Sequence, residues 1–218
     1  MTDVPVLPLD AARLEALGHV STATLTTVLL KKGLRNVWMR GTRPLSAGER
    51  RRIGRAFTLR FVPAREDLAT PASWSAPIST RTAIEAMPSG VIAVVGAMGV
   101  VDAGIFGDIL CARMRQREVA ALVTDGVLRD AEGVLATGLP AWCQGVAVFP
   151  NDVVVADADG AVLIPQALLD EVIAASIEQE RQEGWIMREV EGGASLPGLY
   201  PMNEATRSRY EAWKKSSD

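Results

Sequence analysis

Two aspartates and one arginine in the middle of the chain have the types and spacing that could do chemistry. Asp108 stands at the start of a helical stretch, and the pair Arg129-Asp130 follows after twenty residues, which leaves room for one helix, one turn and one strand. An arginine can hold a carboxylate through two parallel hydrogen bonds, and aspartates supply the hard oxygen ligands that Mg²⁺ prefers. Together these side chains could hold a small 2-keto acid against a metal ion.

The residues next to Asp108 favour an anion at the same place. Gly104 and Gly107 precede Asp108, and Ile109 and Leu110 follow it. Backbone N–H groups in the first turn of a helix have no partner within the helix and, with the helix dipole, attract negative charge. We therefore expect a substrate carboxylate to bind at the amides near Gly107, Ile109 and Leu110, where glycine allows a close approach.

Each feature also has a plainer interpretation. Asp108 could be an ordinary helix N-cap, and Arg129-Asp130 could be a surface ion pair in which Asp130 caps the next helix. Both features, however, follow Gly-rich turns at the ends of adjacent apolar strands, which is where α/β proteins place ligands. Their joint occurrence favours a functional site.

Other catalytic residue types are scarce. The single histidine, His19, lies at the end of a helical stretch, so neither a Ser-His-Asp triad nor a three-histidine zinc site is expected. The lysines occur in two polar pairs, unlike a Schiff-base lysine in a desolvated pocket: Lys31, Lys32, Lys214 and Lys215. No G-x-G-x-x-G or P-loop motif is present, so no nucleotide cofactor is expected.

Composition excludes several classes of partner. The chain has 218 residues, 48% of them hydrophobic, a net charge of −3 and no basic tract, so no nucleic acid partner is expected. No apolar stretch approaches the roughly 20 residues of a membrane span, and the N-terminus does not resemble a secretory signal. Cys111 and Cys143 suggest two reduced thiols, and we expect a cytoplasmic protein.

The order of apolar and polar residues predicts strand–helix alternation that gives way to β-rich sequence. The class is therefore α/β or mixed α+β, neither all-α nor a simple doubly wound sheet. Helices are expected over 22–33, 80–87, 108–117, 130–138 and 165–182, and a polar loop over 64–78. Strands are expected over 53–62, 91–96, 120–126, 140–144, 146–149, 153–157 and 161–165.

The stretch from Gly184 onward differs in character. Trp185, Tyr200, Tyr210 and Trp213 stand there among Pro, Gly and charged residues. We expect residues 1–183 to form a single catalytic domain and 184–218 to form an arm. The arm either packs its aromatic side chains on a neighbouring subunit, which we favour, or folds back on its own domain.

Three motifs over residues 90–165 carry a resemblance to a known family. They read GDIL at a helix start, DGVLRD after the next strand, and PNDVVVADADGAVLIP as a later hairpin. In these motifs and their spacing the chain resembles the family of the 4-hydroxy-4-methyl-2-oxoglutarate aldolases and the ribonuclease E regulator RraA. Its tail resembles a subgroup with an extended C-terminal arm.

The resemblance implies a fold, an assembly and a set of roles. The fold would be a layered α/β/β sandwich of the swivelling-domain type, assembled as a homotrimer or homohexamer. Mg²⁺, Mn²⁺ or another divalent metal would lie near Asp130, held largely through waters. Arg129 would bind the keto acid, the amides near Gly107, Ile109 and Leu110 would hold its carboxylate, and Asp108 would position water or assist proton transfer.

The implied activity is that of a metal-dependent aldolase that cleaves a 4-hydroxy-2-keto acid to pyruvate. The same stabilisation of negative charge would serve oxaloacetate decarboxylation as a side activity. Two alternatives remain open. One is another metal-assisted reaction of a sugar-derived keto acid, by a dehydratase or isomerase, and the other is a non-catalytic regulator of ribonuclease E.

The chain departs from the family pattern in one place. Family members usually carry an additional segment after the strand that matches PAWCQG, whereas here Gly145 runs directly into VAVFP. The missing segment would belong to the outer wall of the sandwich and to part of the subunit contact, so these two features are expected to differ from the family. The family also uses an acidic residue of a neighbouring subunit, for which Glu178, Glu180 and Glu183 are candidates.

Overall fold

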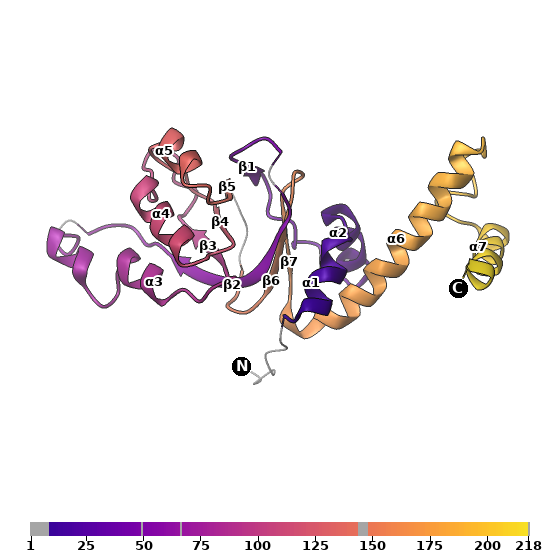
Figure 1. Ribbon diagram of the computed structural model, residues 1–218, viewed down its shortest axis with the longest axis horizontal. Coiled ribbons are helices and arrows are strands. Elements are labelled where there is room, and N and C mark those ends of the chain that lie inside the picture. The colour runs from indigo at the N-terminus through magenta and orange to yellow at the C-terminus, as the bar shows by residue number, and fades with distance from the viewer. Residues whose placement is uncertain (1–8, 49, 66, 144–147, 218) are drawn as a thin grey trace.

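A curled sheet of seven strands forms the centre of the computed structural model, which describes residues 9–48, 50–65, 67–143 and 148–217 (Figure 1). The strand order is β1-β5-β4-β3-β2-β6-β7. The strands are β1 (Arg43–Pro44), β2 (Arg52–Arg60), β3 (Ile92–Gly96), β4 (Ala121–Thr124), β5 (Ala141–Cys143), β6 (Val153–Ala156) and β7 (Ala161–Ile164). The expected mixture of α and β structure is confirmed.

Strand β2 joins two halves of this sheet. Its first residues, 52–55, pair antiparallel with β6, and residues 56–60 pair parallel with β3. Strands β3, β4 and β5 continue the parallel half, while β6 and β7 form an antiparallel hairpin. One long strand therefore carries the chain from the α/β half to the β half of the sandwich.

Helices cover the two halves from different sides. In Figure 1, α3 (Thr80–Ala86), α4 (Asp108–Gln116) and α5 (Ala131–Ala136) lie over the parallel half. The hairpin is covered by α1 (Ala11–Gly18), α2 (Thr22–Lys31) and the start of α6 (Leu169–Glu191). Local sequence fixes several of these helix starts: the Ser21 side chain caps α2 by accepting from the N–H of Thr24, and Ser79 caps α3 by accepting from Thr82.

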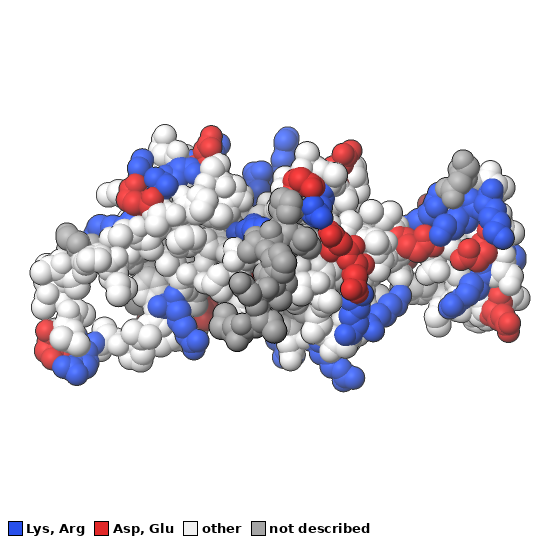
Figure 2. Space-filling view, turned by 90° about the horizontal axis from the view of Figure 1, so that it is seen from below, with Lys and Arg blue, Asp and Glu red and all other residues white. Residues whose placement is uncertain are grey.

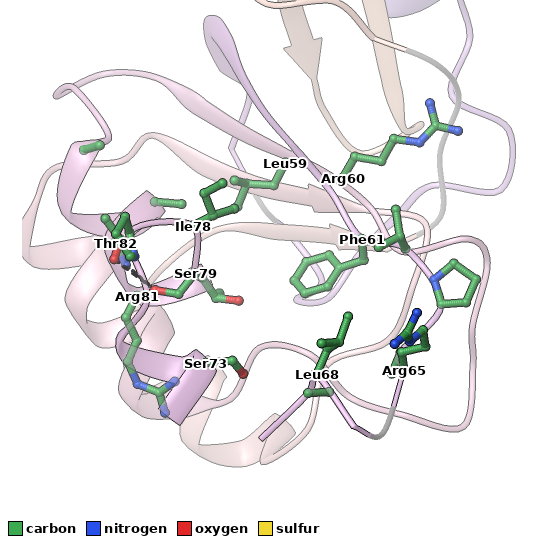
Figure 3. Close-up of a pocket in the computed structure, with 18 residues that line it drawn as sticks. Leu59, Arg60, Phe61, Arg65, Leu68, Ser73, Ile78, Ser79, Arg81 and Thr82 are labelled. Carbon is green, nitrogen blue, oxygen red and sulfur yellow. Dashed lines mark hydrogen bonds between the residues drawn. The ribbon is translucent and has the colours of Figure 1, made fainter. Parts of the chain in front are cut away.

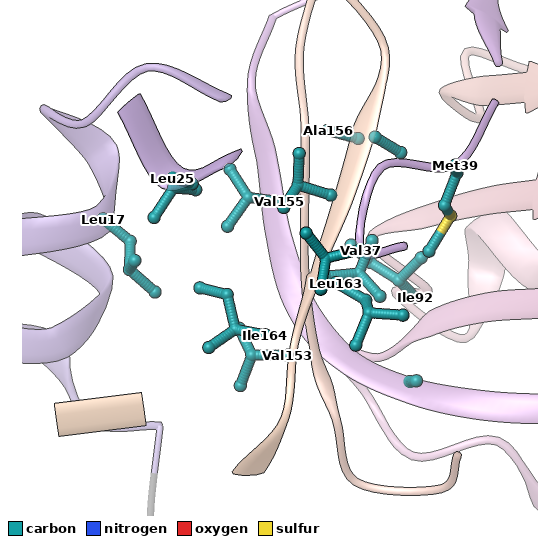
Figure 4. Packing of buried hydrophobic residues seen from close by; sticks show 14 of the residues in the cluster. Leu17, Leu25, Val37, Met39, Ile92, Val153, Val155, Ala156, Leu163 and Ile164 are labelled. Carbon is teal, nitrogen blue, oxygen red and sulfur yellow. The ribbon is translucent and has the colours of Figure 1, made fainter. Parts of the chain in front are cut away.

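Apolar runs explain the burial of the central strands. All four residues of β4, β6 and β7 are buried, as expected for strands that are covered on both faces. One apolar cluster lies between the hairpin and helices α1 and α2 (Figure 4), where Leu17 and Leu25 face Val155 and Ile164. A second cluster fills the space between the parallel strands and α3, α4 and α5. These two cores give the expected layered α/β/β arrangement.

Two expected boundaries need correction. A short 3-10 helix (Pro71–Ser75) interrupts the expected loop 64–78. The helix expected to begin at Pro165 and end near Gln182 starts with a 3-10 turn (Gln166–Leu168) and then continues as α6 to Glu191. Gly184 does not stop it, because an isolated glycine in a helix interior costs only about 1 kcal/mol relative to alanine.

The strand expected over 146–149 is only partly described. Residues 144–147, which include the departure at Gly145, lie outside the described residues. Val148 and Phe149 are described and do not belong to a strand. The start of the hairpin at Val153 agrees with the expectation.

The C-terminal arm is helical and projects from the body. In Figure 1 the distal half of α6 extends away from the sheet, and α7 (Glu204–Ser217) lies beside it. Trp185 and Ile186 of α6 pack with Leu199 and Tyr210 in a small core of their own. On the face shown in Figure 2, Lys, Arg, Asp and Glu side chains lie on the arm among uncharged ones. Across the described parts of the chain, no helix is long and apolar enough to cross a membrane.

Candidate active site

The loops after β3 and β4 bring the three predicted residues together. Asp108 is reached through the loop that follows β3, and Arg129-Asp130 through the loop that follows β4. The two strands are parallel, so both loops leave the same edge of the sheet. The N–H of Arg129 donates to the carbonyl of Phe106 at 3.0 Å, and Phe106 forms an isolated parallel bridge with Leu128. The expectation that these side chains share one site is supported by this contact.

Three glycines make the close approach possible. A β-carbon added to Gly104 would lie 2.7 Å from the Cβ of Arg129, and one added to Gly107 would lie 2.6 Å from Oδ2 of Asp130. A β-carbon added to Gly133 would lie 2.8 Å from the Cβ of Asp108. Real β-carbons do not come so near, so each position accepts only glycine without a shift of its neighbour. Gly133 was not singled out from the sequence.

Asp108 begins α4 without capping it. Gly107 is the N-cap residue, and Asp108 is the first residue of the helix. Its Oδ1 accepts a hydrogen bond of 2.7 Å from the N–H of Ile109. That amide is one of those expected to bind a substrate carboxylate, so in this structure Asp108 occupies the place of the anion there. A ligand could accept a hydrogen bond from the N–H of Ile109 only after the Asp108 carboxylate has rotated away from it.

Arg129 and Asp130 form an exposed ion pair. Their side chains are 66% and 53% exposed, and Nε of Arg129 lies 3.6 Å from Oδ2 of Asp130. Asp130 occupies the N-cap position of α5, but its side chain makes no capping hydrogen bond, and its backbone has φ of 54° in the left-handed region. Aspartate and asparagine adopt this conformation more readily than other residues apart from glycine. The Asp130 carboxylate therefore makes no capping bond to α5 and lies beside Arg129.

The donor set fits a hard, hydrated cation. Asp108 and Asp130 are the two carboxylates of the cluster, and Mg²⁺ commonly binds one or two carboxylates while it keeps several waters. Within residues 9–48, 50–65, 67–143 and 148–217 no group of three or more His, Cys, Asp or Glu side chains could hold a metal by itself. Two carboxylates would suit a water-rich Mg²⁺ or Mn²⁺ better than a structural zinc ion, which takes four protein ligands.

A cavity of about 790 Å³ lies elsewhere on the same sheet edge (Figure 3). It is bounded by the end of β2, the loop after it and α3, and its wall is largely apolar, with Phe61, Leu68 and Ile78 among its residues. It contains neither Asp108 nor the Arg129-Asp130 pair. The ring of Phe61 packs edge-on against Phe106, with centroids 6.4 Å apart. The hydroxyls of Ser73, Ser79 and Thr82 in the cavity wall are used in turns and caps.

The three glutamates that could complete the site of a neighbouring subunit make different contacts in their own chain. Glu178 accepts from the hydroxyl of Tyr210 at 2.9 Å and from Nζ of Lys214 at 2.7 Å, so it holds the arm together. Glu180 accepts from the N–H of Ser21 at 2.8 Å. Glu183 accepts from the side chain of Gln179 at 2.7 Å. All three lie on α6, on the other side of the sheet from α4 and α5 (Figure 1), so none completes the site of its own chain.

The cysteines and the lysines of α2 lie in surroundings that do not favour catalysis. Burial raises the pKa of the Cys111 thiol to about 11, and the nearby Asp108 charge acts in the same direction. Burial also raises the pKa of Cys143. Both thiols are free, and a raised pKa makes them poor nucleophiles at neutral pH. Nζ of Lys32 pairs with Glu171 and that of Lys31 donates to Gln179, in agreement with their expected surface positions.

Comparison with known proteins places this geometry in a family. The sequence model of the RraA-like family, described as Aldolase/RraA, matches residues 20–147, which is more than half of the chain. The chain belongs to the RraA-like family. The matched region includes Asp108, Arg129 and Asp130, so the resemblance seen in the GDIL and DGVLRD motifs is confirmed.

Two curated relatives share part of their length with this RraA-like chain. "Protein DlpA" of Legionella pneumophila is 26% identical over 177 residues, which cover 71% of this chain and 28% of that protein. "Putative 4-hydroxy-4-methyl-2-oxoglutarate aldolase" of Halalkalibacterium halodurans is 26% identical over 121 residues, which cover 45% of this chain and 57% of that protein. The chain thus spans little more than a quarter of the first relative and just over half of the second.

Solved structures share the fold. Streptomyces coelicolor RraAS2, described as an unusual member of the RNase ES inhibitor RraA protein family, matches with a TM-score of 0.72 and 30% identity. The match covers 83% of this chain and 98% of RraAS2. An uncharacterised protein from Pseudomonas syringae pv. tomato matches with a TM-score of 0.76 at 24% identity, over 93% of this chain and all of that one. The expected RraA-like sandwich with a C-terminal arm is confirmed.

Proposed function

We propose that this RraA-like chain is a divalent-metal-dependent aldolase that cleaves a 4-hydroxy-2-keto acid and releases pyruvate. The observation that carries the proposal is the meeting of Arg129 with the Asp108 and Asp130 carboxylates over glycines 104, 107 and 133. The relative named as a 4-hydroxy-4-methyl-2-oxoglutarate aldolase supports the same substrate class. The two free thiols are consistent with a cytoplasmic enzyme.

Arg129 would bind and polarise the keto acid. Its side chain is two-thirds exposed and is held beside the site by the contact of its backbone with Phe106. A guanidinium can donate two parallel hydrogen bonds to the substrate carboxylate, and its fixed positive charge lies where negative charge develops as the bond breaks. Asp130 would hold Mg²⁺ or Mn²⁺, which supplies electrophilic assistance to the keto oxygen when bound.

Asp108 would manage the proton of the C4 hydroxyl. Cleavage removes that proton and turns C4 into the carbonyl carbon of one product, while the electron pair of the C3–C4 bond passes to the pyruvate fragment. Protonation at C3 then completes pyruvate. The Asp108 carboxylate at the start of α4 would act directly or through an ordered water, because the other carboxylate of the cluster, Asp130, is assigned to the metal. Decarboxylation of oxaloacetate also leaves an electron pair on a pyruvate fragment, so we expect it as a side activity.

The arm would serve assembly. Met187, Leu196 and Tyr200 of the arm are each more than half exposed, so the arm offers apolar surface to a neighbour. We propose that residues 184–218 pack on a neighbouring subunit of a homotrimer or homohexamer, and that the site uses an acidic residue of that neighbour. Glu183 is the candidate that we favour, because its carboxylate accepts from a neighbouring side chain of the same helix, whereas Glu178 and Glu180 bind other elements of their own chain.

Pyruvate release tests the proposal directly. The full chain, stripped of metal with chelator, is assayed with 4-hydroxy-4-methyl-2-oxoglutarate and with oxaloacetate, and pyruvate is followed by coupled reduction with lactate dehydrogenase. We expect release with Mg²⁺ or Mn²⁺, none with chelator, and none from the Arg129→Ala variant. No release from either substrate with either metal would overturn the proposal.

A regulator of ribonuclease E is the second candidate. It is favoured by the 30% identity with RraAS2 over most of both chains. A regulator that acts through its surface needs no metal, so its binding to the ribonuclease would survive the Asp130→Ala substitution. Co-purification of the ribonuclease with that variant would support regulation, and its absence with wild-type protein would count against it.

A further inference from the structure

A tight turn starts the loop that leads from β3 to Asp108. Met98 and Gly99 both have left-handed backbones, with φ of 60° and 67°, and the N–H of Val100 donates to the carbonyl of Ala97 at 3.2 Å. Two successive left-handed residues define a turn that glycine enters freely and methionine does not. The conformation at Met98 therefore persists because its surroundings hold it. We refer to residues 97–100 as the turn.

Asp125, the first residue after β4, holds the turn. Its Oδ2 accepts from the N–H of Gly99 at 3.1 Å, and its Oδ1 accepts from the N–H of Ala97. Its own N–H donates to the carbonyl of Val95 at 3.3 Å, which extends the pairing of the two strands. Both carboxylate oxygens are thus bound by backbone amides of the other loop, and charged acceptors make stronger hydrogen bonds than neutral ones.

The packing around this contact is close. A β-carbon added to Gly126 would lie 2.7 Å from the Cβ of Ala97 and 3.4 Å from the carbonyl oxygen of Val100. The loop after β4 therefore rests directly on the turn, with no side chain of residue 126 between them. A second contact joins the same two loops farther along, where Phe106 meets Leu128 and accepts from the N–H of Arg129.

These contacts lie at the two ends of the paired loops. The first joins the loops where they leave the sheet, and the second joins them just before Asp108 and Arg129. A change in the first contact would alter the path of both loops and hence the relative position of the two side chains. Displacements of about 1 Å in a catalytic group can cost on the order of 10²-fold in rate.

We infer that Asp125 is a positioning residue, whose carboxylate clamps the turn and so sets Asp108 against Arg129. The clamp itself is independent of the reaction, but its kinetic consequence rests on the proposed aldolase function. Asp125 is not assigned to substrate or metal, because its two oxygens are engaged by the turn. It acts through the loops that it joins.

The Asp125→Asn variant tests the clamp in the full-length protein. An asparagine places an NH₂ group against one of the two backbone N–H donors, so one hydrogen bond is lost and two donors meet. We expect hydrogen–deuterium exchange to become at least several-fold faster in peptides that cover 97–108 and 125–130, with little change in β6 and β7. The Asp102→Asn variant is the matched control, because Asp102 is an exposed aspartate of the same loop.

Kinetics separate positioning from simple destabilisation. We expect Asp125→Asn to lower kcat by about 10-fold or more with a smaller change in KM, because misalignment of Asp108 and Arg129 affects the transition state more than ground-state binding. The Val154→Ala variant removes buried volume from β6, far along the sheet, and controls for lost stability. It should lower the melting temperature and leave kcat unchanged.

Each outcome decides the inference. Wild-type exchange in both loops of Asp125→Asn, or equal acceleration in Val154→Ala, would overturn it. If Asp125→Asn does not fold, the Gly126→Ala variant is used instead, because its added methyl group would collide with Ala97 in the turn. It must show the same local increase in the rate of hydrogen–deuterium exchange. If wild-type protein releases no pyruvate, the proposed function fails, while the exchange measurement still decides whether Asp125 clamps the turn.

Discussion

Gly133 lies directly against the side chain of Asp108. A β-carbon at position 133 would be 2.8 Å from the Cβ of Asp108 and 3.0 Å from its Oδ2. The first turn of α5 therefore packs on the first residue of α4 without an intervening side chain. This contact fixes Asp108 beside Arg129 and Asp130, which immediately precede α5.

Gly133→Ala should displace Asp108 and lower activity. The added methyl group meets the Cβ of Asp108, which is not a flexible chain end, so either α5 or the Asp108 side chain must move. We expect a loss in kcat/KM of about 10-fold or more, since small misplacements of catalytic groups are costly. Pyruvate release with saturating Mg²⁺ measures it.

Gly184→Ala is the control for this glycine substitution. Gly184 lies inside α6, and a β-carbon there would meet nothing within 4 Å. We expect the free energy of unfolding to rise by about 0.5–1 kcal/mol, because alanine is the better helix former, with unchanged kinetics. Equal activity in the two alanine variants would contradict the assigned role of Gly133.

Arg129→Lys should weaken catalysis although charge is kept. A lysine ammonium cannot reproduce the two parallel hydrogen bonds of a guanidinium. Loss of one charged hydrogen bond, worth about 1.5–3 kcal/mol, corresponds to a fall in kcat/KM of roughly 10- to 100-fold. Arg113→Lys is the control, because Arg113 forms an exposed two-point pair with Glu85 outside the cluster and should show wild-type kinetics.

Asp130→Asn should shift the dependence on metal. Removal of the charge weakens a cation site, and we expect the Mg²⁺ concentration for half-maximal activity to rise by about 10-fold or more. The fold should survive, because asparagine adopts the left-handed backbone of this position readily. A metal-free enzyme titrated with Mg²⁺ gives the comparison, and superimposable titrations of variant and wild type would remove Asp130 from the metal site.

The stability of the arm should fall at high pH. Burial, together with the hydrogen bond to Glu178, raises the pKa of Tyr210 to about 12. A free tyrosine ionises near 10, so between about pH 10 and 12 the folded arm keeps a proton that the unfolded chain has lost. The free energy of unfolding therefore decreases as pH rises through this window.

Spectroscopy can assign that pH dependence to one residue. Absorbance at 295 nm follows tyrosine ionisation, and we expect Tyr210→Phe to remove a step near 12 that Tyr200→Phe leaves in place. Fluorescence of Trp185 and Trp213, which lie in and beside the arm core, follows unfolding of the arm. A wild-type step near 12 that persists in Tyr210→Phe would show that the buried hydroxyl is not its source.

A charge on the exposed apolar surface of the arm should impair assembly. Met187 is 58% exposed on α6, and Met187→Asp places a carboxylate in the proposed contact with a neighbouring subunit. We expect a shift toward the monomer in light scattering coupled to size-exclusion chromatography. Leu30→Asp provides a matched change on α2, where Leu30 is 52% exposed, and should leave the mass of the particle unchanged.

Much of the secondary structure follows from local pattern. Four-residue apolar runs in β4, β6 and β7, and hydroxyl caps at Ser21 and Ser79, are short-range signals that lie within the strand or helix turn they specify. The length of helix α6 was underestimated because the prediction relied on local signals alone. Gly184 is a local signal against helix, and packing of Trp185 and Ile186 in the arm core outweighs it.

The candidate site depends on contacts that no local pattern contains. The sequence shows the residue types, the spacing from Asp108 to Arg129 and the scarcity of histidine and lysine. These features led to the correct family. The parallel pairing of β3 and β4 brings the two loops to one edge, and only there do Gly133 and Asp125 acquire roles. Spacing along the chain determines which residues lie close together within one helix or strand. The distance between two loops depends instead on the register of the strands that carry them and on glycines, whose missing side chains let the loops approach.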